Sequence, residues 1–283
     1  MTSRIAALLL VASVLVAGCS GSDEPGRSAR PTSYVALGDS FVSGPGILPH
    51  VPSSGTCLRS ERDYPALLAA TLDVDVVDVS CGGATTDHVL RDNTTGAAPI
   101  PAQIDAVTTD TDLVTIGIGG NDGRYYEGYF NSCLFPAYRS SDGCRTFAEE
   151  QGPQILVTTR AAITRTIEAV QRRAPAARVV VVGYLRILPS SGACPSMSIA
   201  PADVAQADRA QRALEQAQQD AAREAGAAFV SVRRASEGHD ACAAADPWVN
   251  GLENSVDDGI YLHPTSAGMR AVAAEVAAAV SAG

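Results

Sequence analysis

Residues 34–40, Tyr-Val-Ala-Leu-Gly-Asp-Ser, are the stretch that decides the fold. The first four form a short apolar run that ends at Gly38, a pattern typical of a buried β-strand. Glycine permits tight backbone geometry at the turn after the strand, which leaves the hydroxyl group of Ser40 reachable. The stretch therefore predicts a strand that presents a serine at the edge of a sheet.

Four further apolar runs predict four more strands, at residues 74–79, 113–118, 178–182 and 228–232. Segments with helical spacing lie between and after them, at residues 64–72, 155–173, 202–225 and 265–280. Strands that alternate with helices indicate βαβ units, and hence a parallel sheet with helices on both faces. In such sheets the functional sites form at the carboxyl ends of the strands.

Residues 122–153 interrupt this alternation with a segment rich in tyrosine and phenylalanine that also contains Cys133 and Cys144. A long aromatic insertion after a strand end is a candidate wall for an apolar substrate pocket. The alternative is a structural loop, closed by a disulfide, that packs on the core. The sequence leaves both interpretations open.

Length and charge limit the kinds of fold and function that the chain can have. The 283 residues, 46% of them hydrophobic, suffice for one well-buried domain and a short leader. The formal net charge of −10 at pH 7 repels phosphate backbones, so we expect no nucleic-acid partner.

The first residues are typical of an export signal. Arg4 precedes an uncharged apolar run over residues 5–17, which is shorter than the roughly 20 residues of a membrane-spanning helix. The run ends in Leu-Val-Ala-Gly-Cys19, which resembles a bacterial lipobox, in which the cysteine is lipidated. We therefore predict a lipoprotein-type signal peptide over 1–18 and a flexible tether over 19–33. An ordinary signal, cleaved after a small residue, is the alternative.

The cysteines agree with export. Removing Cys19 from the seven leaves an even number, which predicts three disulfides outside the cell. Their spacing does not select among the 15 possible pairings. Neither a Cys-x-x-Cys motif nor metal-ligand spacing of histidines and carboxylates occurs in the sequence, so we expect no metal site.

A serine hydroxyl needs a base to become a nucleophile, and histidine is the usual base because its pKa lies near neutral pH. His263 is the best candidate, since Pro264 fixes the backbone beside it and Thr265 or Ser266 can cap the C-terminal helix. The remaining histidines, at positions 50, 88 and 239, are interpreted as loop or surface residues.

Four short motifs occur in order at the predicted strand ends, namely Gly38-Asp-Ser40, Cys81-Gly-Gly83-Ala, Gly119-Gly-Asn121-Asp and His263-Pro-Thr265. With them, residues 34–280 resemble the SGNH hydrolase (GDSL-type lipase/esterase) family, and most of all its disulfide-bearing secreted actinobacterial lipases. This resemblance implies a flavodoxin-like three-layer α/β/α fold with a central parallel five-stranded sheet over residues 34–283.

The resemblance also implies roles for individual residues. Ser40 is the nucleophile and His263 its base, while the Ser40 N–H, the Gly83 N–H and the Asn121 amide form an oxyanion hole. Gly82 competes with Gly83 for the second of these positions. The implied disulfides are Cys57–Cys81, Cys133–Cys144 and Cys194–Cys242.

The chain departs from the family at one position. The family usually has an aspartate three residues before the histidine, and this chain has Ile260 there. Either a backbone carbonyl near Ile260 accepts a hydrogen bond from His263 Nδ1, or Asp258 reaches in as a third catalytic member. We favour the carbonyl.

Together these features predict an exported or membrane-anchored serine hydrolase for acylglycerols or simple acyl esters, monomeric and free of cofactors. A phospholipase or a carbohydrate O-acetylesterase would use the same motifs, and a binding lipoprotein without chemistry is a further alternative. A dinucleotide-binding fold is disfavoured because Asp122 stands where the fingerprint needs glycine. An α/β-hydrolase is disfavoured because its Gly-x-Ser-x-Gly motif needs a glycine two residues after the serine, and position 42 is a valine.

Overall fold

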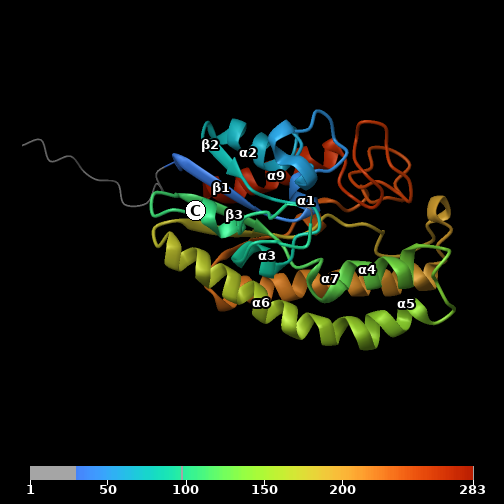
Figure 1. The fold of residues 1–283 in the computed structure, drawn as a ribbon. Coiled ribbons are helices and arrows are strands. Elements are labelled where there is room, and N and C mark those ends of the chain that lie inside the picture. The colour runs from blue at the N-terminus through green and yellow to red at the C-terminus, as the bar shows by residue number, and fades with distance from the viewer. Residues whose placement is uncertain (1–29, 97, 283) are drawn as a thin grey trace, which may run out of the picture.

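A five-stranded parallel sheet forms the centre of the computed structural model, which describes residues 30–96 and 98–282. The strand order is β2-β1-β3-β4-β5. Figure 1 labels the first three of these strands, β2, β1 and β3. The strands are β1 (Ser33–Gly38), β2 (Asp75–Asp78), β3 (Leu113–Gly117), β4 (Arg178–Val182) and β5 (Ala228–Val230). The predicted α/β fold with a parallel five-stranded sheet is confirmed. The predicted signal peptide, Cys19 and residues 20–29 of the predicted tether lie outside the described residues.

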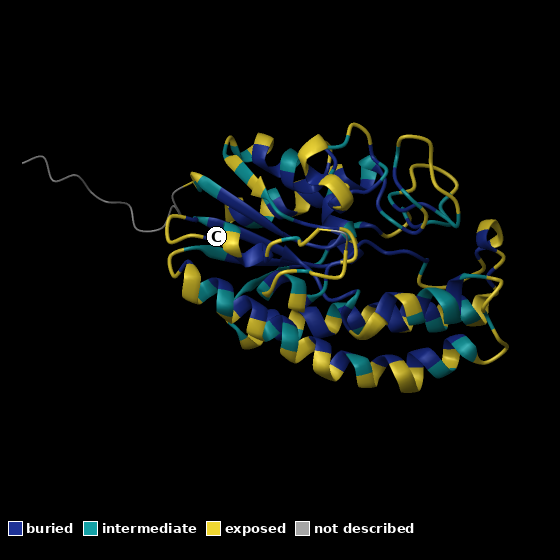
Figure 2. Ribbon diagram, in the orientation of Figure 1, coloured by how far each residue is buried: buried dark blue, intermediate teal, exposed yellow. Residues whose placement is uncertain are grey.

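Helices cover both faces of this sheet. In chain order they are α1 (Ser40–Ser43), α2 (Tyr64–Leu72), α3 (Thr86–Leu90), α4 (Tyr125–Tyr129), α5 (Gly143–Thr146), α6 (Gly152–Arg173), α7 (Pro201–Glu224), α8 (Val232–Ala235) and α9 (Ser266–Ala282). Helices α2 and α9 lie on one side of the sheet, and α3, α6 and α7 lie on the other (Figure 1). The result is a three-layer α/β/α arrangement in which the central strands β1, β3 and β4 are buried between the helices, whereas the edge strand β2 is partly exposed (Figure 2).

Strand β1 shows why the sheet needs helices on both faces. Tyr34 and Ala36 belong to the apolar cluster that includes α2 and α9, whereas Val35 and Leu37 belong to the cluster that includes α6. All four side chains are buried, because successive residues of a strand point to opposite faces. The continuous apolar run seen in the sequence is therefore the signature of a central strand.

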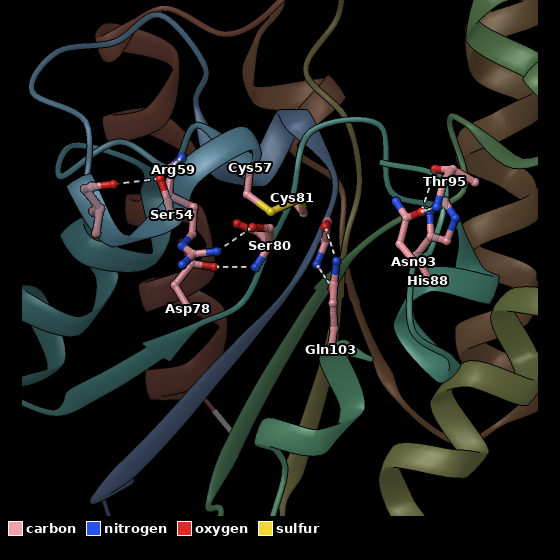
Figure 3. The surroundings of a disulfide bond; sticks show 12 residues. Ser54, Cys57, Arg59, Asp78, Ser80, Cys81, His88, Asn93, Thr95 and Gln103 are labelled. Atoms are coloured by element: carbon pink, nitrogen blue, oxygen red, sulfur yellow. Dashed lines mark hydrogen bonds between the residues drawn. A yellow bond between two sulfur atoms is a disulfide. The ribbon is translucent and has the colours of Figure 1, made fainter. Parts of the chain in front are cut away.

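The carboxyl ends of β1 and β3 lie side by side, with Gly38 paired to Gly117. A Cβ atom on Gly38 would lie 2.2 Å from Val42 Cγ2 and 2.7 Å from the Gly117 carbonyl oxygen. The side chain of Gln103 brackets the same glycine, accepting from its N–H and donating to its carbonyl, each at 2.8 Å (Figure 3). Only glycine fits at this position, directly before Asp39 and Ser40.

Three disulfides close the loops around the sheet: Cys57–Cys81, Cys133–Cys144 and Cys194–Cys242. These are the pairs that the resemblance implied. The first joins the loop after β1 to the turn that carries Gly82 and Gly83 (Figure 3). It therefore ties two of the segments that the sequence motifs single out.

Two carboxyl groups lie close together, that of the buried Asp63 and that of the partly buried Asp78. Asp63 caps α2 by accepting a hydrogen bond from the Ala66 N–H at 2.9 Å, and Asp78 accepts from the Ser80 N–H at 2.8 Å. Burial, followed by the charge of Asp78, raises the pKa of Asp63, and the Arg59 guanidinium only partly opposes this. The two carboxyl groups therefore hold a proton more tightly than free aspartates do, and we expect Asp63 to carry it at neutral pH.

The Asp63→Asn variant tests this protonation. In the unfolded chain Asp63 loses its proton above its ordinary pKa of 3.8, whereas in the folded chain it keeps the proton to higher pH. Rising pH therefore stabilises the unfolded chain relative to the folded one, and the free energy of unfolding falls. The slope for one such group is at most about 1.4 kcal/mol per pH unit. Asparagine keeps the helix cap and is neutral in both states. We expect urea denaturation to show a shallower decline between pH 5 and pH 8 for the variant, which becomes the more stable protein at pH 8.

Asp75→Asn is the matched control, because Asp75 is an exposed carboxyl on the same β2 strand as Asp78. It should retain the slope of the unsubstituted protein. Equal slopes for Asp63→Asn and the unsubstituted protein would contradict a protonated Asp63.

Candidate active site

Ser40 and His263, 223 residues apart in sequence, meet at the carboxyl end of the sheet. The distance from Ser40 Oγ to His263 Nε2 is 2.8 Å. Ser40 is the first residue of α1, which follows β1 directly, and His263 lies in the loop before α9. The hydroxyl group is thus within hydrogen-bond reach of a base, as nucleophilic catalysis requires.

The turn that carries Ser40 is held by Asp39, which is fully buried. Asp39 Oδ1 accepts a hydrogen bond from the Phe41 N–H at 3.0 Å and so caps α1. The helix lasts a single turn and ends at Gly44, whose φ of +65° lies in the left-handed region. Ser40 therefore sits at a helix N-terminus, where the backbone N–H groups have no partner inside the helix.

His263 is oriented by a backbone carbonyl. Its Nδ1 atom lies 2.8 Å from the Tyr261 carbonyl oxygen. Because a carbonyl oxygen only accepts, Nδ1 carries the hydrogen and Nε2 is left to accept from Ser40. Burial lowers the pKa of His263 from 6.5 to about 4, against the opposing effect of the Tyr261 hydrogen bond. The imidazole is consequently neutral at physiological pH.

Asp258 has a different partner. Its Oδ1 accepts from the Ser266 N–H at 2.7 Å, at the start of α9. The Ile260 carbonyl accepts from the His263 main-chain N–H at 3.2 Å, and also from Asn250 Nδ2 at 3.3 Å. Of the two alternatives, the geometry supports a backbone carbonyl, and it is that of Tyr261, the residue after Ile260.

Asn121 and Gly83 face the same end of the sheet. Asn121 Nδ2 donates to the Ala84 carbonyl at 2.9 Å, which uses one of its two amide hydrogens and leaves the other for a ligand. The Gly82 N–H donates to the Cys57 carbonyl at 3.3 Å. The Gly83 N–H has no acceptor among the described residues, and Gly83 is exposed with a φ of +74°. These contacts favour Gly83 over Gly82 as a donor to a bound ligand.

A hydrogen-bonded bridge connects the turn that carries Gly83 with the turn that carries Asn121. Asp122 accepts from the Thr86 N–H at 3.1 Å and from the Thr86 hydroxyl group. Burial raises the pKa of Asp122, while the two Thr86 hydrogen bonds oppose that rise. The two turns are thereby held in a fixed relation.

The segment over residues 122–153 packs on the core, as one of the two interpretations expected, and it also places aromatic rings next to the candidate site. Tyr125, Tyr129 and Phe147 are buried in the core, and the Cys133–Cys144 disulfide closes the segment. Other aromatic rings form a series that starts beside the imidazole, with neighbouring centroids 5.0–6.2 Å apart: His263, Phe41, Tyr126, Phe130, Phe135 and Tyr261. At its outer end Tyr261 is 42% exposed, so the series links the site to the surface.

The three remaining histidines make local contacts. His50 Nε2 accepts from the Gly46 N–H at 3.0 Å, His88 Nδ1 accepts from the Thr85 N–H at 3.3 Å, and His239 stacks on Trp248. Among the described residues, no group of three or more histidines, cysteines or carboxylates could hold a metal ion. None of the described helices combines the length and apolar character needed to cross a membrane.

Sequence analysis missed two contributors to the site. Tyr261 acts through its backbone carbonyl, for which side-chain identity gives no signal. Tyr184 donates a hydrogen bond from its hydroxyl group to Asp39 Oδ2 at 2.6 Å. Its position just after β4 was a usable signal, because sites in parallel sheets lie at strand ends.

Comparisons with known proteins identify the family of the chain. The profile of the GDSL-like Lipase/Acylhydrolase family matches residues 36–271. The chain is 34% identical to Lipase 2 of Streptomyces coelicolor over 284 residues, which cover 96% of this chain and 94% of that protein.

Solved structures give the same result. The extracellular lipase from Streptomyces rimosus matches with a TM-score of 0.75 and 32% identity, over 88% of this chain and 99% of that one. Phospholipase A1 from Streptomyces albidoflavus matches with a TM-score of 0.74 and 26% identity, over 89% of this chain and 99% of that one. The chain therefore belongs to the GDSL-like lipase/acylhydrolase family and is a carboxylic ester hydrolase.

Proposed function

We propose that Ser40 and His263 form the catalytic pair of this hydrolase. The 2.8 Å contact between Ser40 Oγ and His263 Nε2 is the observation that carries the proposal. Neutral His263 removes the hydroxyl proton as Ser40 Oγ bonds to the acyl carbonyl carbon, and then returns the proton to the departing alcohol. A water molecule repeats the sequence on the acyl-enzyme, releasing the acid and restoring Ser40.

An oxyanion hole of three donors stabilises the negative charge on the carbonyl oxygen. The donors are the Ser40 N–H at the start of α1, the exposed Gly83 N–H and the free amide hydrogen of Asn121. They come from the ends of β1, β2 and β3, and the pairing of these strands holds them before substrate arrives. Donors that need no reorganisation during the reaction are the effective ones.

A catalytic dyad describes the site better than a triad. The Tyr261 carbonyl fixes the tautomer and ring orientation of His263, which is one of the two tasks of a triad aspartate. The other task is to stabilise the imidazolium, and a carbonyl dipole does this less strongly than a full charge. The Asp258 carboxylate is occupied at the start of α9 instead.

Esters with a lipid-like acyl chain are the proposed substrates. Phe130, Phe135 and Tyr261 extend the aromatic series from the catalytic pair to the surface, and apolar lining suits a hydrocarbon chain. The names of the relatives, Lipase 2 and phospholipase A1, support acylglycerols first and phospholipids second. Both carry the acyl ester bond that this site would cleave.

Export is a further part of the proposal. Three disulfides are typical of proteins outside the reducing cytoplasm, and the related Streptomyces rimosus lipase is extracellular. We propose lipidation at Cys19. The predicted tether over 19–33 ends at Ser33, which the structure places in β1, and this strand runs from there to Gly38, close to Ser40 (Figure 1). An anchored domain would therefore present its active site away from the membrane that holds it.

Hydrolysis of p-nitrophenyl esters from acetyl to palmitoyl tests the catalytic residues. Ser40→Ala removes the nucleophile, so its turnover should fall to background. Asn121→Ala removes one oxyanion donor and should lower kcat by about 10² to 10³. The unsubstituted protein should prefer chains longer than acetyl. Titration of the fatty acid released from phosphatidylcholine and from a triacylglycerol separates a phospholipase from a lipase.

Ser53→Ala, at an exposed serine in the loop after β1, is the matched control and should keep full activity. Full activity in Ser40→Ala would rule out Ser40 as the nucleophile. Full activity in Asn121→Ala would remove Asn121 from the oxyanion hole, and a preference for acetyl esters would favour a deacetylase.

Asp258→Asn distinguishes a dyad from a triad. Asparagine keeps an oxygen that can accept from the Ser266 N–H, so the start of α9 should stay intact. We expect kcat within about tenfold of the unsubstituted protein, because loss of a true triad aspartate costs about 10⁴. Steady-state kinetics on the preferred ester provide the measurement, and a loss near the larger figure would restore Asp258 as the third catalytic member.

A further inference from the structure

One buried phenol connects the turn that carries the nucleophile with the turn that carries Asn121. Tyr184, two residues after β4, is 4% exposed. Its hydroxyl oxygen accepts a hydrogen bond from the Gly120 N–H at 2.8 Å and donates to Asp39 Oδ2 at 2.6 Å. The bridge spans 64 residues of sequence on one side and 145 on the other.

The direction of the two hydrogen bonds is determined by their chemistry. The Gly120 amide can only donate, and a carboxylate can only accept, so the phenolic hydrogen must point to Asp39. Hydrogen bonds to an ionised group are short and strong, and a chain of such bonds polarises its members. Burial raises the pKa of Asp39 to about 7, so above that pH Asp39 is ionised and the bridge has this one arrangement of its hydrogens.

Packing fixes the ring as firmly as the hydrogen bonds fix the hydroxyl group. Phe41 contacts the Tyr184 ring edge-on with centroids 5.0 Å apart, and Tyr126 does so at 5.1 Å. A Cβ atom on Gly120 would lie 2.3 Å from Tyr126 Cε2 and 3.1 Å from the Tyr184 hydroxyl oxygen. The backbone at Gly120 is therefore pressed against the phenol, and a shift of either would be transmitted to the other.

Each end of the bridge adjoins a proposed catalytic group. Asp39 precedes Ser40 and caps the helix on which Ser40 lies. Gly120 precedes Asn121, whose amide is the oxyanion donor from β3. Moving one bridge end relative to the other would change the distance between the nucleophile and that donor.

We propose that Tyr184 is a positioning residue for the oxyanion hole: its hydroxyl group sets the separation of Ser40 and Asn121 by bridging Asp39 and Gly120. The inference rests on the proposed roles of Ser40 and Asn121. Tyr184 does not touch the reacting atoms. Its effect is on the alignment of the Asn121 amide with the developing oxyanion, so the transition state should be affected more than the bound substrate.

Tyr184→Phe removes the hydroxyl group and keeps the ring between Phe41 and Tyr126. We expect kcat per active site to fall about ten- to a hundredfold. Misplacing a catalytic group by about 1 Å lowers the rate by up to about 10², and losing an oxyanion donor altogether lowers it by about 10² to 10³. KM should stay within about twofold. An alkyl boronic acid that bonds to Ser40 as a tetrahedral anion should lose affinity by the same factor as kcat/KM.

Titration of active sites with a chromogenic phosphonate separates this effect from partial unfolding, because kcat is then counted per competent site. Tyr129→Phe is the matched control. Tyr129 is also fully buried, and its hydroxyl group has no hydrogen-bond partner in the described part of the chain. It should retain the unsubstituted kcat and boronate affinity.

Asp39→Asn alone and combined with Tyr184→Phe completes a double-mutant cycle. If Tyr184 acts through Asp39, the kcat of the double variant should be little lower than the kcat of the less active single variant. Three outcomes would each overturn the inference. Tyr184→Phe could keep the kcat per site of the unsubstituted protein, or it could change KM alone. The double variant could also show a fall in kcat equal to the product of the two single falls. An unsubstituted protein that hydrolyses no ester would contradict the proposed function instead.

Discussion

The parallel pairing of β1 with β3 is the constraint on which the site depends. It places Gly38 beside Gly117, so the residues that follow, Ser40 on one strand and Asn121 on the other, emerge at the same edge. The close packing at Gly38 leaves no alternative path for the turn. The proposed nucleophile and the proposed oxyanion donor, more than eighty residues apart in sequence, emerge at one edge because two apolar strands must bury their faces between layers of helices.

The position of the histidine does not depend on this strand pairing, and the group that orients its ring is unusual. His263 lies on an irregular loop, where a carboxylate usually orients the ring, yet the partner here is the Tyr261 carbonyl two residues away. A backbone acceptor cannot be protonated and cannot be lost by a side-chain substitution. Together with the low pKa of the buried imidazole, it keeps Nε2 available to Ser40 over a wide range of pH. Local backbone geometry thus takes over a task that a distant side chain performs elsewhere.

Apolar patterning and four short motifs were sufficient to predict the parallel sheet and to identify the residues that meet at its edge. The partner of His263 could not be predicted to the residue, because any carbonyl near Ile260 satisfies the pattern. The aromatic segment after β3 was ambiguous because aromatic residues serve cores and pockets alike. Several of its rings are buried in the core, and others continue the series of ring contacts that starts beside His263. Tyr184 was missed because its hydroxyl group bonds to residues far away in sequence.

Covalent labelling of Ser40 tests the central claim, the Ser40–His263 pair, most directly. The disulfide-intact protein and its His263→Ala variant would be treated with a fluorophosphonate, and the adduct would be located by peptide mass spectrometry. We expect stoichiometric labelling at Ser40, with a rate that drops by about 10² or more in the variant, since the base activates the hydroxyl group. Labelling at another residue, or an unchanged rate without His263, would contradict this claim.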